Sequence, residues 1–272
     1  MRIELAIKNN TLCTQPSVKA AFERAIQGNG RLHLLGLLSD GGVHSHINHL
    51  LAFLKGAQAA GVSRTFVHAF GDGRDTAPRS AQAYLQSLLD HLDAHQYGEL
   101  ASLTGRYYAM DRDKRWERIK IAYEGLVQGL GEHSDDVLKT LADRYQKDET
   151  DEFLKPIILG SQGRIQDGDT LLFFNYRSDR MREINQALGV APLPFETSIV
   201  PKNIAITTMT QFKSDFPFPV VFPPQVMTNV LAEWLGKLQV PQSHQAETEK
   251  FAHVTVSFFW NSKNASSSST GE

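Results

Sequence analysis

Arginine and histidine side chains recur in four short polar motifs along the chain, each directly after an apolar run. The motifs read SDGGVHSH, GDGRD, TGRYYAMDR and NYRSDR. They contain the five arginines Arg74, Arg106, Arg112, Arg177 and Arg180. A guanidinium group offers a planar fork of donors that matches phosphate or carboxylate oxygens two at a time. Any one of these arginines is more simply explained as a structural salt bridge, but the complete set predicts a site for a small, multiply charged anion.

The histidines of the first motif allow a second interpretation. His44, His46 and His49 have a spacing that is compatible with metal ligation. However, no cysteine or carboxylate cluster stands near them, and His46 and His49 fall on the expected first turn of a helix, where they can bond backbone groups or water. We therefore favour His44 as a proton donor or anion contact in a loop, and we predict no metal ligands.

The elements that must position these motifs alternate along the chain. Apolar runs predict strands at 32–38, 65–70, 100–103, 170–174 and 203–208, and apolar residues at helical spacing predict helices at 18–26, 47–60, 84–92, 119–127 and 137–145. Residues 104–116 are expected to form a loop. The alternation predicts an α/β fold, a layered sandwich with a mostly parallel sheet covered by helices. Ligands bind at the carboxyl ends of strands in such sheets, which is where the four motifs stand.

Composition excludes several classes of protein. The 272 residues are 41% hydrophobic and 21% charged, which is ordinary globular usage rather than that of disordered, collagen-like or coiled-coil chains. A net charge of −2 argues against a nucleic-acid partner, and no apolar run is long enough to span a membrane. A single cysteine and an N-terminus without signal-peptide features favour a reducing, cytoplasmic location.

The C-terminal part of the chain is less regular. Four prolines within residues 216–224 (FPFPVVFPP) exclude a helix and disfavour a central strand, so this segment is the best candidate for a linker. Beyond it, 226–238 is amphipathic, 251–259 alternates like a strand, and the last residues are rich in serine and resemble a disordered tail.

Six motifs together resemble a known family. SDGGVHSH, GDGRD, TGRYYAMDRDKRW, DEFLKPIIL, NYRSDR and AETEKFAHVT follow the order found in the cofactor-independent (2,3-bisphosphoglycerate-independent) phosphoglycerate mutases. The resemblance extends from about Ile3 to about Thr255. It implies a glycolytic isomerase that interconverts 3-phosphoglycerate and 2-phosphoglycerate through a phosphoserine. It also implies a phosphatase-like domain, with two manganese ions and the serine, into which a phosphotransferase domain is inserted.

The resemblance assigns a role to eight residues by motif. His44 would contact the substrate and protonate a leaving oxygen, and Asp75 would accept a proton from a hydroxyl group. The remaining positions would bind the substrate or its phosphoryl group: Arg74 beside Asp75, then Arg106, Arg112, Arg177, Arg180 and Lys250.

The departures from the family pattern are equally informative. The family's nucleophilic serine and metal ligands have no counterpart in this sequence, so neither an activated serine nor a bound manganese pair is expected here. We therefore predict a phosphotransferase domain at 1–224, an incomplete returning segment of the phosphatase-like domain at 225–260 and a disordered tail at 261–272. By family the chain is a phosphoglycerate mutase with 3-phosphoglycerate and 2-phosphoglycerate as its small-molecule partners, and it is expected to be a monomer that is inactive alone. The alternatives are a non-catalytic module that binds phosphoglycerate or another anion and a fragment without an independent role.

Overall fold

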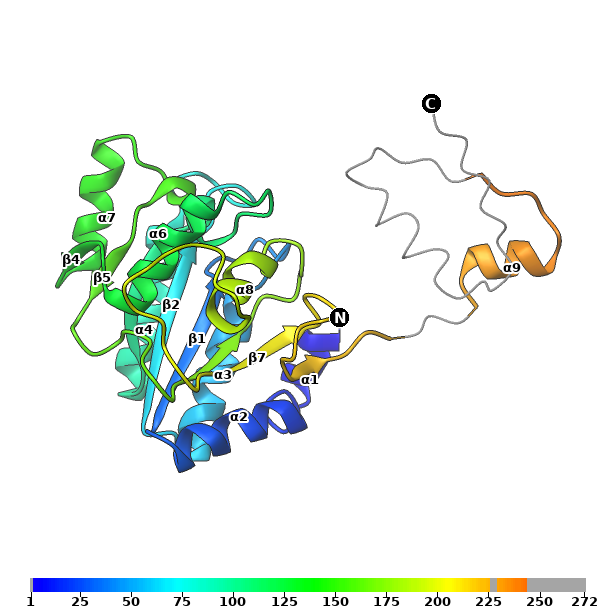
Figure 1. Cartoon of the computed structure of the whole chain (residues 1–272), viewed down its shortest axis with the longest axis horizontal. Coiled ribbons are helices and arrows are strands. Elements are labelled where there is room, and N and C mark those ends of the chain that lie inside the picture. The colour runs from blue at the N-terminus through cyan, green and yellow to red at the C-terminus, as the bar shows by residue number, and fades with distance from the viewer. Residues whose placement is uncertain (1, 226–228, 244–272) are drawn as a thin grey trace. The chain divides into compact units, whose positions relative to one another are not determined.

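The computed structural model describes residues 2–225 and 229–243, and its strands form one twisted sheet (Figure 1). The order across the sheet is β4-β5-β3-β2-β1-β6-β7-β8. Every neighbouring pair is parallel except β3 and β5, which are antiparallel. The strands are β1 (Arg31–Leu37), β2 (Arg64–Gly71), β3 (Glu99–Gly105), β4 (Glu132–Ser134), β5 (Ile157–Leu159), β6 (Thr170–Phe173), β7 (Ala205–Thr210) and β8 (Val220–Phe222).

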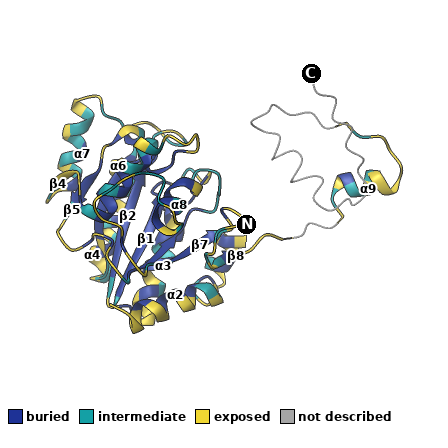
Figure 2. Cartoon of the chain, in the orientation of Figure 1, coloured by how far each residue is buried: buried dark blue, intermediate teal, exposed yellow. Residues whose placement is uncertain are grey.

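Helices cover both faces of the sheet. One hydrophobic cluster joins one face to α1 (Arg2–Lys8), α2 (Pro16–Gln27), α3 (Ile47–Ala60), α4 (Ala81–His95) and α7 (Val137–Gln146). A second cluster joins the opposite face to α5 (Arg106–Ala109), α6 (Trp116–Gln128) and α8 (Arg182–Gly189). Figure 2 shows that the central strands are almost wholly buried. β1, for example, is buried at every residue. This burial on both faces is typical of a parallel sheet in an α/β protein.

Local sequence explains where the helices begin and end. His46 precedes α3, and its side chain accepts a hydrogen bond from the amide of Asn48, which satisfies one of the free donors at the helix start. Gly61 ends the same helix with φ of +83°, a left-handed conformation that glycine adopts without the usual steric cost. The predicted end of this helix at Gly61 is therefore confirmed.

The predicted alternation of strands and helices, and with it the α/β fold class, is confirmed. The interpretation of residues 104–116 as a loop is wrong at its start, where Arg106–Ala109 form the short helix α5. β4 and β5 were not predicted either, because strands of three residues are too short to show a clear periodicity.

The proline-rich segment is more ordered than the linker interpretation suggested. Val220–Phe222 form β8, which pairs with β7 at the edge of the sheet, a position where flanking prolines remove no ladder hydrogen bond. The chain divides into two compact units immediately afterwards, at Met1–Pro223 and Pro224–Glu272. The second unit contains α9 (Leu231–Lys237), within the predicted amphipathic stretch. The strand expected at 251–259 and the tail expected at 261–272 lie outside the described residues.

A search of the described residues for a helix that could span a membrane found none.

Candidate functional site

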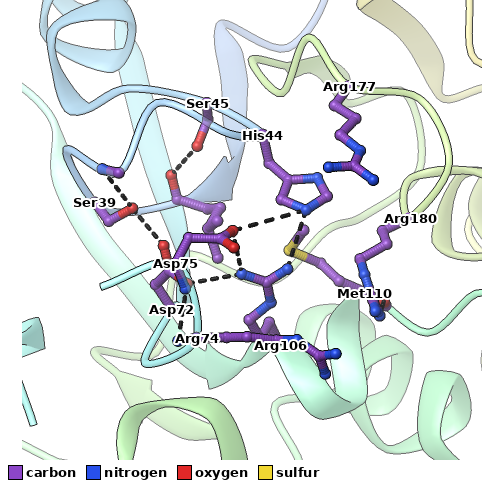
Figure 3. A network of polar contacts seen from close by, with 12 residues as sticks. Ser39, His44, Ser45, Asp72, Arg74, Asp75, Arg106, Met110, Arg177 and Arg180 are labelled. Carbon is purple, nitrogen blue, oxygen red and sulfur yellow. Dashed lines mark hydrogen bonds and ion pairs between the residues drawn. The ribbon is translucent and has the colours of Figure 1, made fainter. Parts of the chain in front are cut away.

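The carboxyl ends of four adjacent strands bring the polar motifs together. β1 leads into the loop with His44, β2 into the turn with Arg74 and Asp75, and β3 directly into Arg106. β6 leads into the segment that carries Arg177 and Arg180, and Figure 3 shows these side chains around the space beside Arg106 and His44. We call this group of residues, together with Arg112, the carboxyl-end site.

Arg106 is the centre of the carboxyl-end site and is only 2% exposed. One of its terminal nitrogens, Nη1, donates to Asp72 Oδ1 at 2.7 Å and to Asp75 Oδ2 at 2.6 Å. The other, Nη2, lies 3.0 Å from His44 Nε2. Because a guanidinium group can only donate, His44 Nε2 must accept this hydrogen bond.

The state of His44 follows from this contact. Burial lowers the pKa of His44 to about 4, and the charge of Arg106 acts in the same direction. The ring is therefore neutral at pH 7, with its proton on Nδ1. That nitrogen is buried and has no hydrogen-bond partner among the described residues, although Asp179 Oδ1 lies 4.0 Å away. A buried donor without a partner is available to a ligand oxygen.

Asp72 holds the turn that presents Arg74 and Asp75. Its Oδ1 accepts from the amides of Arg74 at 3.2 Å and Asp75 at 2.9 Å, and its Oδ2 accepts from Ser39 Oγ at 2.6 Å. Burial raises the pKa of Asp72, but these hydrogen bonds and Arg106 outweigh it and keep the pKa below its ordinary value. Asp72 was not among the predicted site residues, although an aspartate that opens a glycine-containing turn is a recognisable signal.

Close backbone contact explains the glycines beside this turn. Gly71 and Gly105, the last residues of β2 and β3, lie against the short helix Asp151–Phe153. A Cβ atom at Gly105 would stand 2.3 Å from the carbonyl oxygen of Glu152, so no other residue fits. The approach lets Glu152 reach Arg74, with 3.4 Å between Oε1 and Nη1.

Asp179 accepts hydrogen bonds from two arginines of the carboxyl-end site. Its Oδ2 accepts from Arg112 Nη1 at 3.0 Å, and its Oδ1 accepts from Arg177 Nε at 3.0 Å. Burial raises the pKa of Asp179, but the charge of Arg177 and the hydrogen bonds from Arg177 and Arg112 outweigh burial and lower it. Asp179 was missed by the sequence analysis, although the RSDR motif places an acidic residue directly between the arginines.

Arg180 lies close enough to the other arginines of the carboxyl-end site for their charges to act on it. Its Nη1 donates to the carbonyl oxygen of Met110 at 3.1 Å. Its pKa is lowered by burial and then by the charges of Arg112, Arg106 and Arg74. The predicted arginines therefore lie near enough to repel one another, which is the arrangement expected of a site whose natural ligand is an anion. The exposed fractions of the Arg74, Arg112 and Arg177 side chains, at 56%, 38% and 38%, leave room for such a ligand.

The structure does not bring every candidate residue to this site. His46 caps α3, and His49 Nε2 lies 3.5 Å from Glu4 Oε1 of α1, so the three histidines of the first motif point to different partners. In the described part of the chain, no three His, Cys, Asp or Glu side chains are grouped so that they could hold a metal ion. The described residues thus do not fit a manganese pair. Lys250 lies outside the described residues.

Comparison with known proteins gives consistent results. Residues 3–214 match the family model described as BPG-independent PGAM N-terminus. Curated relatives named 2,3-bisphosphoglycerate-independent phosphoglycerate mutase include those of Onchocerca volvulus, 54% identical over 265 residues, and Caenorhabditis elegans, 53% identical over 267 residues. The matches cover 96% of this chain but only 51% and 49% of these relatives, so the chain spans about half of their length.

A solved structure shares the fold. The crystal structure of Leishmania mexicana phosphoglycerate mutase at low cobalt concentration is 28% identical and superposes with a TM-score of 0.79. The match covers 97% of this chain and 51% of that one.

Proposed function

Because this chain belongs to the 2,3-bisphosphoglycerate-independent phosphoglycerate mutase family, we propose that its carboxyl-end site binds 3-phosphoglycerate and 2-phosphoglycerate. The observation that carries the proposal is the convergence of five arginines and His44 at the ends of adjacent strands. Both ligands carry a phosphate and a carboxylate, and paired guanidinium groups bind both kinds of anion through charge-assisted hydrogen bonds. In the longer relatives, this part would serve the interconversion of the two isomers in glycolysis.

The chemistry assigned to the site concerns proton transfer. Asp75 would take a proton from the substrate hydroxyl group, while Arg106 keeps its carboxylate in place through Nη1. His44 would give a proton to the leaving oxygen. An anion bound beside the His44 ring favours its charged form, so ligand binding itself would raise the low pKa of this histidine and prepare it as an acid.

We further propose that residues 1–224 act as the phosphotransferase domain and that 225–260 are part of a phosphatase-like domain, followed by a tail at 261–272. Manganese and the phosphoserine of the family would then be held by residues that have no counterpart in this sequence. The proton transfers assigned to Asp75 and His44 would therefore take place only in the longer relatives, where the serine takes the phosphoryl group as the oxygen of the glycerate leaves. The chain as given would be a cytoplasmic monomer that binds phosphoglycerate and does not isomerise it.

Titration calorimetry with 3-phosphoglycerate tests the binding. Arg74→Ala removes a half-exposed guanidinium group whose described ion pair is with Glu152, so the fold should survive. Hydrogen bonds to charged groups are worth about 1.5–3 kcal/mol, so the dissociation constant should rise roughly tenfold or more. Arg79→Ala is the matched control, because Arg79 is equally exposed but pairs with Asp148. Equal affinities of all three proteins would refute the assigned site.

A mutase assay with manganese separates the alternatives. Binding without turnover supports a substrate-binding module, whereas clear isomerisation by this chain would overturn the proposal that it is inactive alone. The absence of both binding and turnover would favour a fragment without an independent role.

A further inference from the structure

The turn that carries Arg112 is held by a residue outside the predicted site. The turn comprises Asp111–Arg115, between α5 and α6, and Glu183 of α8 reaches it with its side chain. Glu183 Oε1 accepts a hydrogen bond from the Lys114 amide at 2.8 Å. Lys114 has φ of +59°, a left-handed conformation that is uncommon for a residue other than glycine and that persists only where surrounding contacts enforce it.

The interior of the turn depends on a buried carboxylate. Asp111 is 3% exposed, and its Oδ2 accepts from the amides of Asp113 and Arg115, both at 2.9 Å. Its other oxygen lies 3.5 Å from Nη1 of Arg118 on α6. Arg180 Nη1 donates to the carbonyl oxygen of Met110, just before the turn, so the turn is fixed at its start, within it and at Lys114.

The buried carboxyl group of Glu183 is only partly hydrogen-bonded. It is 6% exposed, and its Oε2 has no hydrogen-bond partner among the described residues. Burial raises the pKa of Glu183 to about 7, and the carboxylates of Asp111 and Asp113 also raise it, which together outweigh the Lys114 amide. A proton on Oε2 would remove the repulsion between two buried carboxylates and could be donated to Asp111.

We propose that Glu183 is a positioning residue for Arg112, that its carboxyl group fixes the Asp111–Arg115 turn, and that it does so most firmly when protonated. The ligand-binding consequence rests on the proposed function, because it concerns Arg112 as a contact for phosphoglycerate. The charged groups that face Glu183 or its partner Asp111 are Asp113 in the turn and Arg118 on α6. When Glu183 is ionised, its charge opposes Asp111, the turn loosens and Arg112 is presented less precisely.

Hydrogen exchange of the full chain without ligand tests the effect on the turn. Protection of the peptide that contains Lys114, corrected for the intrinsic pH dependence of exchange, should fall several-fold between pH 6 and pH 8. Glu183→Gln cannot ionise and should show no such fall, while Glu183→Ala should be poorly protected at both pH values. Glu23→Gln, an exposed substitution on α2, should behave as the wild type. Unchanged wild-type protection, or a Glu183→Gln protein with the wild-type pH dependence, would overturn the proposal.

Binding of 3-phosphoglycerate tests the consequence separately. The ratio of wild-type to Glu183→Gln dissociation constants should rise several-fold from pH 6 to pH 8, and this ratio cancels the titration of the ligand phosphate. A constant ratio with measurable binding would refute the role of Glu183 in positioning Arg112. If neither protein binds the ligand but the exchange behaves as expected, the proposed function fails while the hold on the turn stands.

Discussion

Arg106 combines structural and functional demands in one side chain. It joins three strand ends by contacting Asp72, Asp75 and His44, and both Arg106 and Asp72 are 2% exposed. Removing one partner of a buried ion pair leaves an uncompensated charge, which costs about 3–5 kcal/mol. We therefore expect Arg106→Met to lower the free energy of unfolding in urea by roughly that amount at pH 7.

The matched control for this prediction is Arg115→Met. Arg115 is half exposed, and its Nη1 lies 3.6 Å from Asp113 Oδ2. Exposed pairs contribute about 0–1 kcal/mol, so this variant should unfold almost as the wild type does. Equal losses in both variants would show that the buried network around Arg106 adds no particular stability.

At the scale of elements, sequence patterning was informative wherever burial is periodic. The long helices and central strands were predictable because their apolar residues repeat at 3.6 or lie in continuous buried runs. The convergence of the arginines was predictable because their motifs follow strands directly, and ligands bind at the carboxyl ends of the strands in such sheets. By contrast, the partners of the arginines depend on three-dimensional proximity. Asp179 pairs with Arg112, and Glu183 holds the turn that carries it. Asp179 stands between two arginines of its motif, but nothing in the local sequence distinguishes Glu183 from a surface carboxylate.

A buried polar row that joins three strands to Asp169, the residue before β6, gives the sheet a pH-dependent stability. His33 on β1 lies 2.8 Å from Asp169 Oδ2 through Nε2 and 2.9 Å from His68 Nε2 through Nδ1. His68 Nδ1 in turn lies 2.8 Å from Ser102 Oγ. Since the carboxylate must accept, one consistent chain of donors runs from Ser102 to Asp169 with both rings neutral. Protonating His33 would place a second donor, Nδ1–H, opposite the Nε2–H of His68, whereas protonating His68 would require the Ser102 hydroxyl to turn and accept from Nδ1.

We predict that this row destabilises the fold in acid. Burial lowers the pKa of His33 and lowers that of His68 well below 6.5. The unfolded chain therefore binds more protons than the folded chain below about pH 6.5, and the free energy of unfolding falls as the pH falls through that region. Glu183 opposes this trend, because its raised pKa makes the folded state bind more protons between pH 4.5 and 7. His68→Gln should reduce the slope of the free energy of unfolding against pH by up to about 1.4 kcal/mol per pH unit.

Urea unfolding at pH 7.0, 6.0 and 5.5 measures this slope. His133→Gln serves as the control, because His133 lies exposed on the edge strand β4. The control should retain the wild-type slope. If His68→Gln also retains it, the polar row does not link folding to proton uptake.

At the scale of the whole molecule, the fold is contained in the first compact unit. Among the described residues, both hydrophobic clusters are formed by residues within Met1–Pro223. β8 closes this unit at its edge, where Val221 and Phe222 are 5% and 8% exposed and Ser17 of α2 donates to the carbonyl oxygen of Val220 at 2.8 Å. The proline-rich segment thus contributes the last strand of the unit, and the division falls near its end, between Pro223 and Pro224.

This arrangement predicts opposite outcomes for two truncations. A chain of residues 1–223 should unfold in urea within about 0.5 kcal/mol of the full chain, the usual effect of a change outside a core. A chain of residues 1–215 lacks β8 and with it the buried side chains of Val221 and Phe222. Because burying one apolar side chain contributes about 1.5–3 kcal/mol, the loss of both should lower the free energy of unfolding by roughly 3–6 kcal/mol. It also exposes the edge of β7, which favours aggregation. Marked destabilisation of the 1–223 chain would mean that Pro224–Glu272 contributes to the fold, and unchanged stability of the 1–215 chain would mean that β8 does not.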